Sequence, residues 1–114
     1  MLDDPTRLLL VATDGDRVIG MLGTWGQSDH GINFGMLVSA AYRRMGAGRA
    51  LLEAAADWAR KFRAPALTLH VFPHNEAAIA LYRSAGFVEM ERFERDVTRQ
   101  DGEVWDTILM RKEL

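Results

Sequence analysis

The strongest constraint on the fold is a change in the spacing of apolar residues along residues 32–62. In residues 32–38 apolar side chains alternate with other residues, which predicts a strand with one buried face. In residues 46–62 they recur every three or four residues, which predicts a helix whose buried face ends at Phe62. A further apolar run follows at residues 66–72. A strand, a helix and a second strand in this order predict a parallel pair with a right-handed crossover.

The segments on either side of this unit predict hairpins. Residues 7–12 and 17–25 are two expected strands, joined through an Asp-Gly dipeptide that is typical of tight hairpin turns. Residues 87–99 and 103–110 form a last expected hairpin. The predicted fold class is α/β (α+β), with a mixed, mostly antiparallel sheet of about six strands, a central parallel pair and two main helices. We expect a single domain over residues 1–114.

Composition excludes several classes of function. The 114 residues are 48% hydrophobic and 26% charged, with a formal net charge of −2. This balance predicts no broad basic face for nucleic acid or for an anionic membrane. The absence of cysteine excludes disulfides, thiolate metal sites and cysteine nucleophiles, and it fits a cytoplasmic protein. His70 and His74 lack carboxylate or thiolate company, so we predict no metal.

The turn Arg43-x-x-Gly46-x-Gly48 predicts an anion site at the start of the first helix. Glycine lets the backbone come close to a ligand, and a helix N-terminus presents N–H groups that have no partner inside the helix. Arg44 and Arg49 add donors beside these groups. A dinucleotide-binding turn would need Gly-x-Gly-x-x-Gly, and a Walker loop would need Gly-Lys-Ser/Thr; neither is present here. We therefore predict a bound pyrophosphate.

A second pattern, Asn75-x-x-Ala78-x-x-Leu81-Tyr82-x-x-x-Gly86-Phe87, follows the strand predicted at residues 66–72. Taken alone, it is explained by a helix that Asn75 caps and Gly86 ends, with Tyr82 in the core. Its position behind the arginine-glycine turn makes chance a poor explanation of the two patterns together.

The two patterns together resemble the GNAT superfamily of acetyl-CoA-dependent N-acetyltransferases. The strand Met36-Leu-Val38 and the arginine-glycine turn match the acetyl-CoA motif of that family. Leu69-x-Val71 and the Asn75 pattern match its second motif, and Asp106-Thr-Ile-Leu-Met110 looks like its last strand. The resemblance covers nearly the whole chain.

The resemblance implies that acetyl-CoA is the donor substrate. The backbone near Leu37 and Val38 would hydrogen-bond the acetyl carbonyl and the pantetheine arm, and the turn would hold the pyrophosphate. Asn75 would contact the pantetheine where the two central strands separate. The residues that the resemblance assigns to cofactor binding are Met36, Leu37, Val38, Arg43, Arg44, Met45, Gly46, Ala47, Gly48, Arg49, Asn75, Ala78 and Tyr82.

The resemblance also implies direct attack by an amine acceptor in a ternary complex, with Tyr82 as the general acid that protonates the departing thiolate. A phenol suits this role because its hydroxyl is protonated at neutral pH. A primary amine with a pKa of about 10 must also lose a proton, at a cost of about 4 kcal/mol at pH 7.

The proton acceptor for this step is left open by the sequence. Relatives often place a glutamate at the position of Asn33, and an amide cannot act as a base. Asp29, His30 and His70 are substitutes by residue type. We expect a water-mediated base or an acceptor of low pKa.

Relatives usually begin with a strand and two helices that form much of the acceptor pocket, whereas this chain begins at what looks like their second strand. We expect either a truncated fragment or a partner subunit at the exposed sheet edge, and hence a homodimer. Two alternatives remain: a non-catalytic acyl-CoA-binding or regulatory module, and an oligomeric scaffold without a ligand. The sequence does not identify the acceptor.

Overall fold

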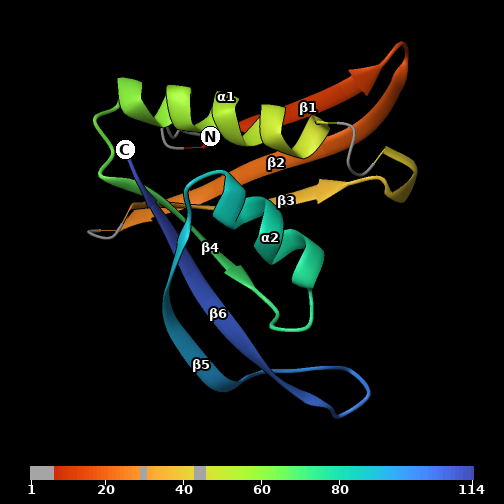
Figure 1. The fold of residues 1–114 in the computed structure, drawn as a ribbon, viewed down its shortest axis with the longest axis vertical. Helices are drawn as coiled ribbons and strands as arrows, with labels where there is room; N and C mark the ends of the chain where they lie inside the picture. Colours follow the sequence, from red (N-terminus) through yellow and green to blue (C-terminus); the bar gives the residue numbers. More distant parts are fainter. Residues whose placement is uncertain (1–6, 29–30, 43–45) are drawn as a thin grey trace, which may run out of the picture.

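A computed structural model describes residues 7–28, 31–42 and 46–114. In these ranges the chain forms six strands, two α-helices and one short 3₁₀ turn (Figure 1). The elements are β1 (Leu9–Asp14), β2 (Arg17–Ser28), β3 (Gly31–Val38), η1 (Ala40–Tyr42), α1 (Ala47–Lys61), β4 (Ala66–Val71), α2 (Glu76–Ser84), β5 (Val88–Thr98) and β6 (Val104–Glu113).

The six strands form one mixed sheet in the order β1-β2-β3-β4-β6-β5. Only β3 and β4 run parallel, and the chain connects them through α1. The other neighbouring strands are antiparallel. The predicted fold class is therefore confirmed, including the central parallel pair and the two helices.

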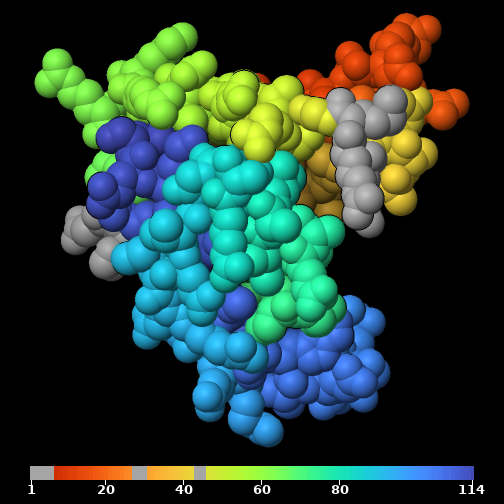
Figure 2. Space-filling view, in the orientation of Figure 1, coloured from red at the N-terminus to blue at the C-terminus, as the bar shows by residue number. Residues whose placement is uncertain are grey.

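Both helices pack on the same face of the sheet. The aromatic rings of Phe34 on β3 and Tyr82 on α2 lie 6.3 Å apart, with Phe87 against both. A β-carbon built on Gly48 of α1 would lie 2.9 Å from a methyl group of Leu81 on α2 and 3.4 Å from the Met36 methyl. Figure 2 shows α1 and α2 in contact on this face. The core lies between these helices and strands β2, β3, β4 and β6.

The buried face of α1 is shorter than its apolar spacing predicts. Gly48, Leu51, Ala55 and Ala59 are buried, but Phe62 follows the helix and is 44% exposed. The expectation that Phe62 closes the buried face is therefore wrong. Its ring instead lies 5.1 Å from the ring of Trp58.

Candidate active site

The central parallel pair separates after a short contact. β3 and β4 are in register only at Ile32 with Leu67 and at Asn33 with Thr68. Beyond this point β3 stays paired with β2 as far as Val38, and β4 stays paired with β6. The edge of β3 that faces β4 therefore carries backbone N–H and C=O groups outside any ladder described in the structure. An extended ligand can bind such an edge as an added strand does.

The start of α1 offers backbone donors next to open space. Gly46 precedes the helix with a φ of 86°, and within the described ranges no side chain caps the helix at this end. A β-carbon at Gly46 would meet no heavy atom within 4 Å. These observations fit a turn whose backbone approaches an anion. Arg43, Arg44 and Met45 lie outside the described residues.

Arg49 makes a contact that the sequence did not predict. Its guanidinium donates to Ser84 Oγ at 2.6 Å, and Ser84 Oγ donates to the Leu81 carbonyl at 2.7 Å. The first turn of α1 is thereby connected to the last turn of α2. Arginine has five N–H donors, so this bond leaves others for a phosphate.

Gly48 has a packing reason in addition to the predicted ligand approach. It is buried, and the Leu81 methyl group occupies the space that a side chain would need. Met36 contacts the same position, and Ala47 begins the helix beside it. The small residue therefore allows α1 to approach α2 closely.

Replacing Gly48 with leucine is expected to destabilise the protein by about 1–3 kcal/mol, because the larger side chain overpacks the contact with Leu81. Urea denaturation of the unliganded protein measures this loss. Ala50→Leu, an exposed position on the same helix, is the matched control. Equal stability of the two variants would contradict the packing role.

Tyr82 lies on α2 at the point where β3 and β4 separate. Its side chain is 7% exposed, and its ring makes edge contacts with Phe34 and Phe87. Burial raises the pKa of the phenol above its ordinary value, so the hydroxyl stays protonated at neutral pH. Among the described residues, none forms a hydrogen bond with this hydroxyl. The group is therefore suited to donate a proton to a ligand.

Asn75 caps α2, as the sequence predicts. Its side-chain oxygen accepts a hydrogen bond from the Ala78 N–H at 3.4 Å. The side-chain amide N–H groups of Asn75 are separate from this bond. Asn75 and Ala78 thus lie at the start of α2, which follows β4 in the chain.

Asn33 is held at the last paired position of the two strands. Thr68 Oγ1 donates a hydrogen bond to Asn33 Oδ1, which joins β3 to β4 where they begin to separate. His70 follows on the same face of β4, because side chains two residues apart in a strand point the same way. Its ring is exposed and lies 5.7 Å from the ring of Phe93. Asp29 and His30 lie outside the described residues.

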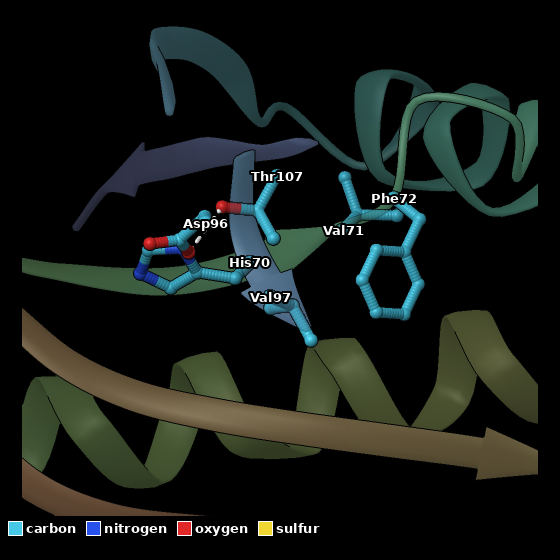
Figure 3. A pocket seen from close by; sticks show the side chains of 6 residues that line it. All are labelled: His70, Val71, Phe72, Asp96, Val97 and Thr107. Atoms are coloured by element: carbon cyan, nitrogen blue, oxygen red, sulfur yellow. Dashed lines mark hydrogen bonds between the residues drawn. The ribbon is translucent and has the colours of Figure 1, made fainter. Parts of the chain in front are cut away.

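A hollow of about 330 Å³, which the sequence did not predict, is lined on one side by His70 (Figure 3). Asp96 on β5 and Thr107 on β6 line it, and Thr107 Oγ1 donates to Asp96 Oδ2 at 2.8 Å. The remaining lining residues are Val71, Phe72 and Val97. The charged run around Asp96 gave no alternation from which its orientation can be read. The hollow depends on pairing between β5 and β6, which is not local in sequence.

The described residues contain no group of three or more histidine, cysteine, aspartate or glutamate side chains that could hold a metal ion. No helix in these ranges has the length and apolar character needed to cross a membrane.

Known proteins similar to this chain are acetyltransferases. The [ribosomal protein bS18]-alanine N-acetyltransferase of Escherichia coli (strain K12) is 46% identical over 61 residues, which span 54% of this chain and 41% of that relative. The crystal structure of the ribosomal-protein-S18-alanine N-acetyltransferase from Escherichia coli matches with a TM-score of 0.82 and 31% identity, covering 97% of this chain and 71% of that chain. The sequence match thus spans less than half of the relative's length.

Two other solved structures share the fold. The acetyltransferase of the GNAT family from Streptococcus pneumoniae matches with a TM-score of 0.87 and 28% identity, covering 97% of this chain and 69% of that chain. The yncA structure from Salmonella typhimurium, solved with its cofactor acetyl-CoA, matches with a TM-score of 0.84 over 96% of this chain and 66% of that chain. At 23% identity, this second likeness concerns the fold alone.

A family model described as the acetyltransferase (GNAT) family matches residues 1–87. The match covers more than half of the chain and includes β3, α1, β4 and α2, the elements that surround the separation of the central strands. It ends before β5 begins. The chain therefore belongs to the acetyltransferase (GNAT) family.

Proposed function

We propose that this chain is a cytoplasmic N-acetyltransferase that moves an acetyl group from acetyl-CoA to a primary amine in a ternary complex. The observation that carries the proposal is the separation of β3 and β4 with the buried, protonated Tyr82 beside it. This arrangement offers a free strand edge for the pantetheine arm and a proton donor for its sulfur.

The donor site combines three groups of the chain. The backbone of Leu37 and Val38 supplies strand-edge hydrogen bonds to the acetyl carbonyl and the pantetheine. The start of α1, from Gly46 to Arg49, supplies N–H groups and a guanidinium to the pyrophosphate. Support comes from the open space beside Gly46 and from the free edge of β3.

The transfer step is a direct substitution at the thioester carbonyl. The amine nitrogen forms the new C–N bond, the C–S bond breaks, and Tyr82 gives its proton to the leaving thiolate.

The proton of the attacking amine leaves through water. Asn33 is excluded as the base because it is an amide whose oxygen already accepts from Thr68. We place His70 next to this water, because it follows the separation point on β4. Holding the two reactants in place supplies further rate enhancement without a dedicated base.

The test is thiol release from acetyl-CoA in the presence of a panel of primary amines. Amine-dependent release, with a stoichiometric acetylated product in the mass spectrum, is the expected result. A chain that binds coenzyme A but releases no thiol with any amine is a binding module instead. A chain whose melting temperature coenzyme A does not raise is a scaffold without this ligand.

We also propose a homodimer, supported by an exposed apolar face of the sheet. Six large hydrophobic side chains on β1, β2 and β3 are between 41% and 72% exposed, and three of them are aligned across these strands at Val11, Met21 and Leu37. The other three are Leu9, Val18 and Trp25. Monomers rarely expose a contiguous apolar patch of this kind.

Light scattering should give twice the mass of one chain, and Met21→Lys should lower the measured mass toward that of the monomer. The mass of a monomer at all protein concentrations would contradict the dimer.

A further inference from the structure

The hollow at the end of β4 is lined by both apolar and polar side chains. Phe72 and Val97 provide aromatic and hydrocarbon surface, and Asp96 and His70, which are both exposed, provide polar atoms (Figure 3). Val71 also borders the hollow, but its side chain is buried in the core. Its volume of about 330 Å³ lies at the lower end of the range for small-molecule pockets. His70 lies two residues past the last residue of β4 that pairs with β3. The hollow therefore begins close to the separation at which we propose acetyl transfer.

A β-bulge brings Asp96 to the hollow. Phe93 pairs with Thr107 and Val97 pairs with Trp105, so three residues of β5 oppose one residue of β6. Arg95, inside the bulge, has a φ of 53°, which is uncommon for a side chain other than glycine. Bulges of this kind redirect side chains, often next to active sites. Asp96 therefore reaches Thr107, although Val97 lines the same hollow.

Asp106 fixes the bulge from the opposite strand. One carboxylate oxygen accepts the backbone N–H of Arg95 at 2.9 Å, and the other accepts the Arg92 guanidinium at 2.8 Å. The Arg95 N–H and the Arg92 guanidinium hold the pKa of Asp106 below its ordinary value. The conformation that presents Asp96 is therefore part of the folded hairpin.

The Asp96 carboxylate has no cationic partner within 4 Å among the described residues. Arg92 pairs with Asp106, and the Arg99 guanidinium lies 4.2 Å from the centre of the Trp105 ring. Residues 88–113, which form the β5–β6 hairpin, contain eight carboxylates and five arginine or lysine side chains, a net charge of −3. The hairpin is thus more negative than the whole chain, whose net charge is −2. This field attracts cations toward the hollow.

From these observations we propose that the hollow selects an acceptor amine that carries a second, cationic group on an apolar spacer. The spacer packs against Phe72 and Val97, and the distal ammonium pairs with the Asp96 carboxylate. Thr107 orients that carboxylate through its hydroxyl. The proposal rests on the proposed acetyl transfer for the fate of the other amine. It makes Asp96 a specificity-determining residue.

The first experiment compares 1,5-diaminopentane with 1-aminopentane as acceptors at moderate ionic strength. The wild-type chain should prefer the diamine in kcat/KM by about tenfold or more beyond the statistical factor of two. Asp96→Asn should abolish this preference, mainly through KM, because the charged hydrogen bond is lost. Glu94→Gln removes the same charge from the same strand, outside the hollow, and should keep the preference.

A second arm distinguishes a free diamine from a peptide. Alanyl-lysine amide and alanyl-norleucine amide differ only in the distal charge. A preference that depends on Asp96 in either pair of acceptors supports the proposal and identifies the source of the cation. An equal loss in Asp96→Asn and Glu94→Gln, or no preference in either pair, overturns it.

Direct binding keeps this test independent of turnover. An NMR titration with 1,5-diaminopentane should give weaker binding to Asp96→Asn than to Glu94→Gln. If 1-aminopentane is acetylated but neither pair shows a preference, the cation site fails and the transferase proposal stands. If no amine is acetylated, the transferase proposal fails, and the titration still decides whether the hollow binds the diamine. Unchanged binding in Asp96→Asn would contradict the site.

Discussion

Replacing Tyr82 with phenylalanine is expected to lower kcat for acetyl transfer by about 10²- to 10⁴-fold, which is the range for loss of a positioned general acid. The substitution removes only the hydroxyl and keeps the ring that packs on Phe34 and Phe87. The thiolate would then leave without a proton donor from the protein. Steady-state kinetics with a primary amine acceptor measure the loss, and coenzyme A affinity should change little.

The control for this variant is Tyr42→Phe. That phenol lies near the surface, outside the proposed site, where its hydroxyl donates to Asp14 at 3.0 Å. Loss of it should leave kcat near the wild-type value. Full turnover by Tyr82→Phe would remove the general-acid assignment and would leave protonation of the thiolate to water.

The raised pKa of Tyr82 makes a separate prediction about pH. Because burial favours the neutral phenol, the proton remains on Tyr82 above pH 10, the ordinary value for tyrosine. The decline of kcat that this group causes should therefore appear only above pH 10, and Tyr82→Phe should abolish it. The free energy of unfolding also depends on this group. Above pH 10 the Tyr82 phenol ionises in the unfolded chain before it does in the folded chain, so the folded state loses stability as pH rises through the raised pKa.

Replacing Gly46 with valine should weaken coenzyme A binding by about ten- to a hundredfold. A β-branched residue strongly disfavours the φ of 86° found at Gly46, at a cost of at least about 1–2 kcal/mol. The turn must then either change conformation or direct a side chain into the open space at the start of α1. In both cases the backbone N–H groups no longer reach the pyrophosphate. Isothermal titration calorimetry measures the dissociation constant.

Two variants separate strain from ligand approach. Gly102→Val introduces valine at a φ of 89° in the turn between β5 and β6, and should leave coenzyme A affinity unchanged. Gly46→Asn adds a side chain that tolerates the left-handed conformation, so any loss of affinity reports obstruction of the ligand. Wild-type affinity in Gly46→Val would contradict the anion site at this turn.

Most of the architecture was predictable because its determinants are local in the sequence. The change of apolar spacing between Val38 and Gly46 marked where β3 ends and α1 begins, and Asn75 marked the start of α2. Phe62 was misplaced because the helix ends before it, and spacing alone does not reveal where packing stops. The predicted cofactor residues Leu37, Val38 and Gly46 border the separation or the helix start, and their contacts with a ligand remain predictions.

The acceptor side was less predictable because it depends on pairing between distant residues. The hydrogen bond between Thr68 and Asn33 joins two strands that are far apart in sequence. Asp96 reaches the hollow only because β5 bulges against β6. A bulge inside a charged strand leaves no apolar pattern from which the redirected residue can be recognised.

The short contact between β3 and β4 divides the sheet into two halves. The amino-acid sequence of one half can change with little effect on the structure of the other. Two register pairs join the β1-β2-β3 half to the β4-β6-β5 half. The proposed phosphate and pantetheine contacts to the strand edge and α1 belong to the first half, whereas Asp96 belongs to the second. Residues beyond Phe87, outside the family match, form both strands of the hairpin that carries Asp96. If the proposed role of Asp96 holds, we expect substitutions in that hairpin to change which amine is accepted while the donor site keeps its geometry.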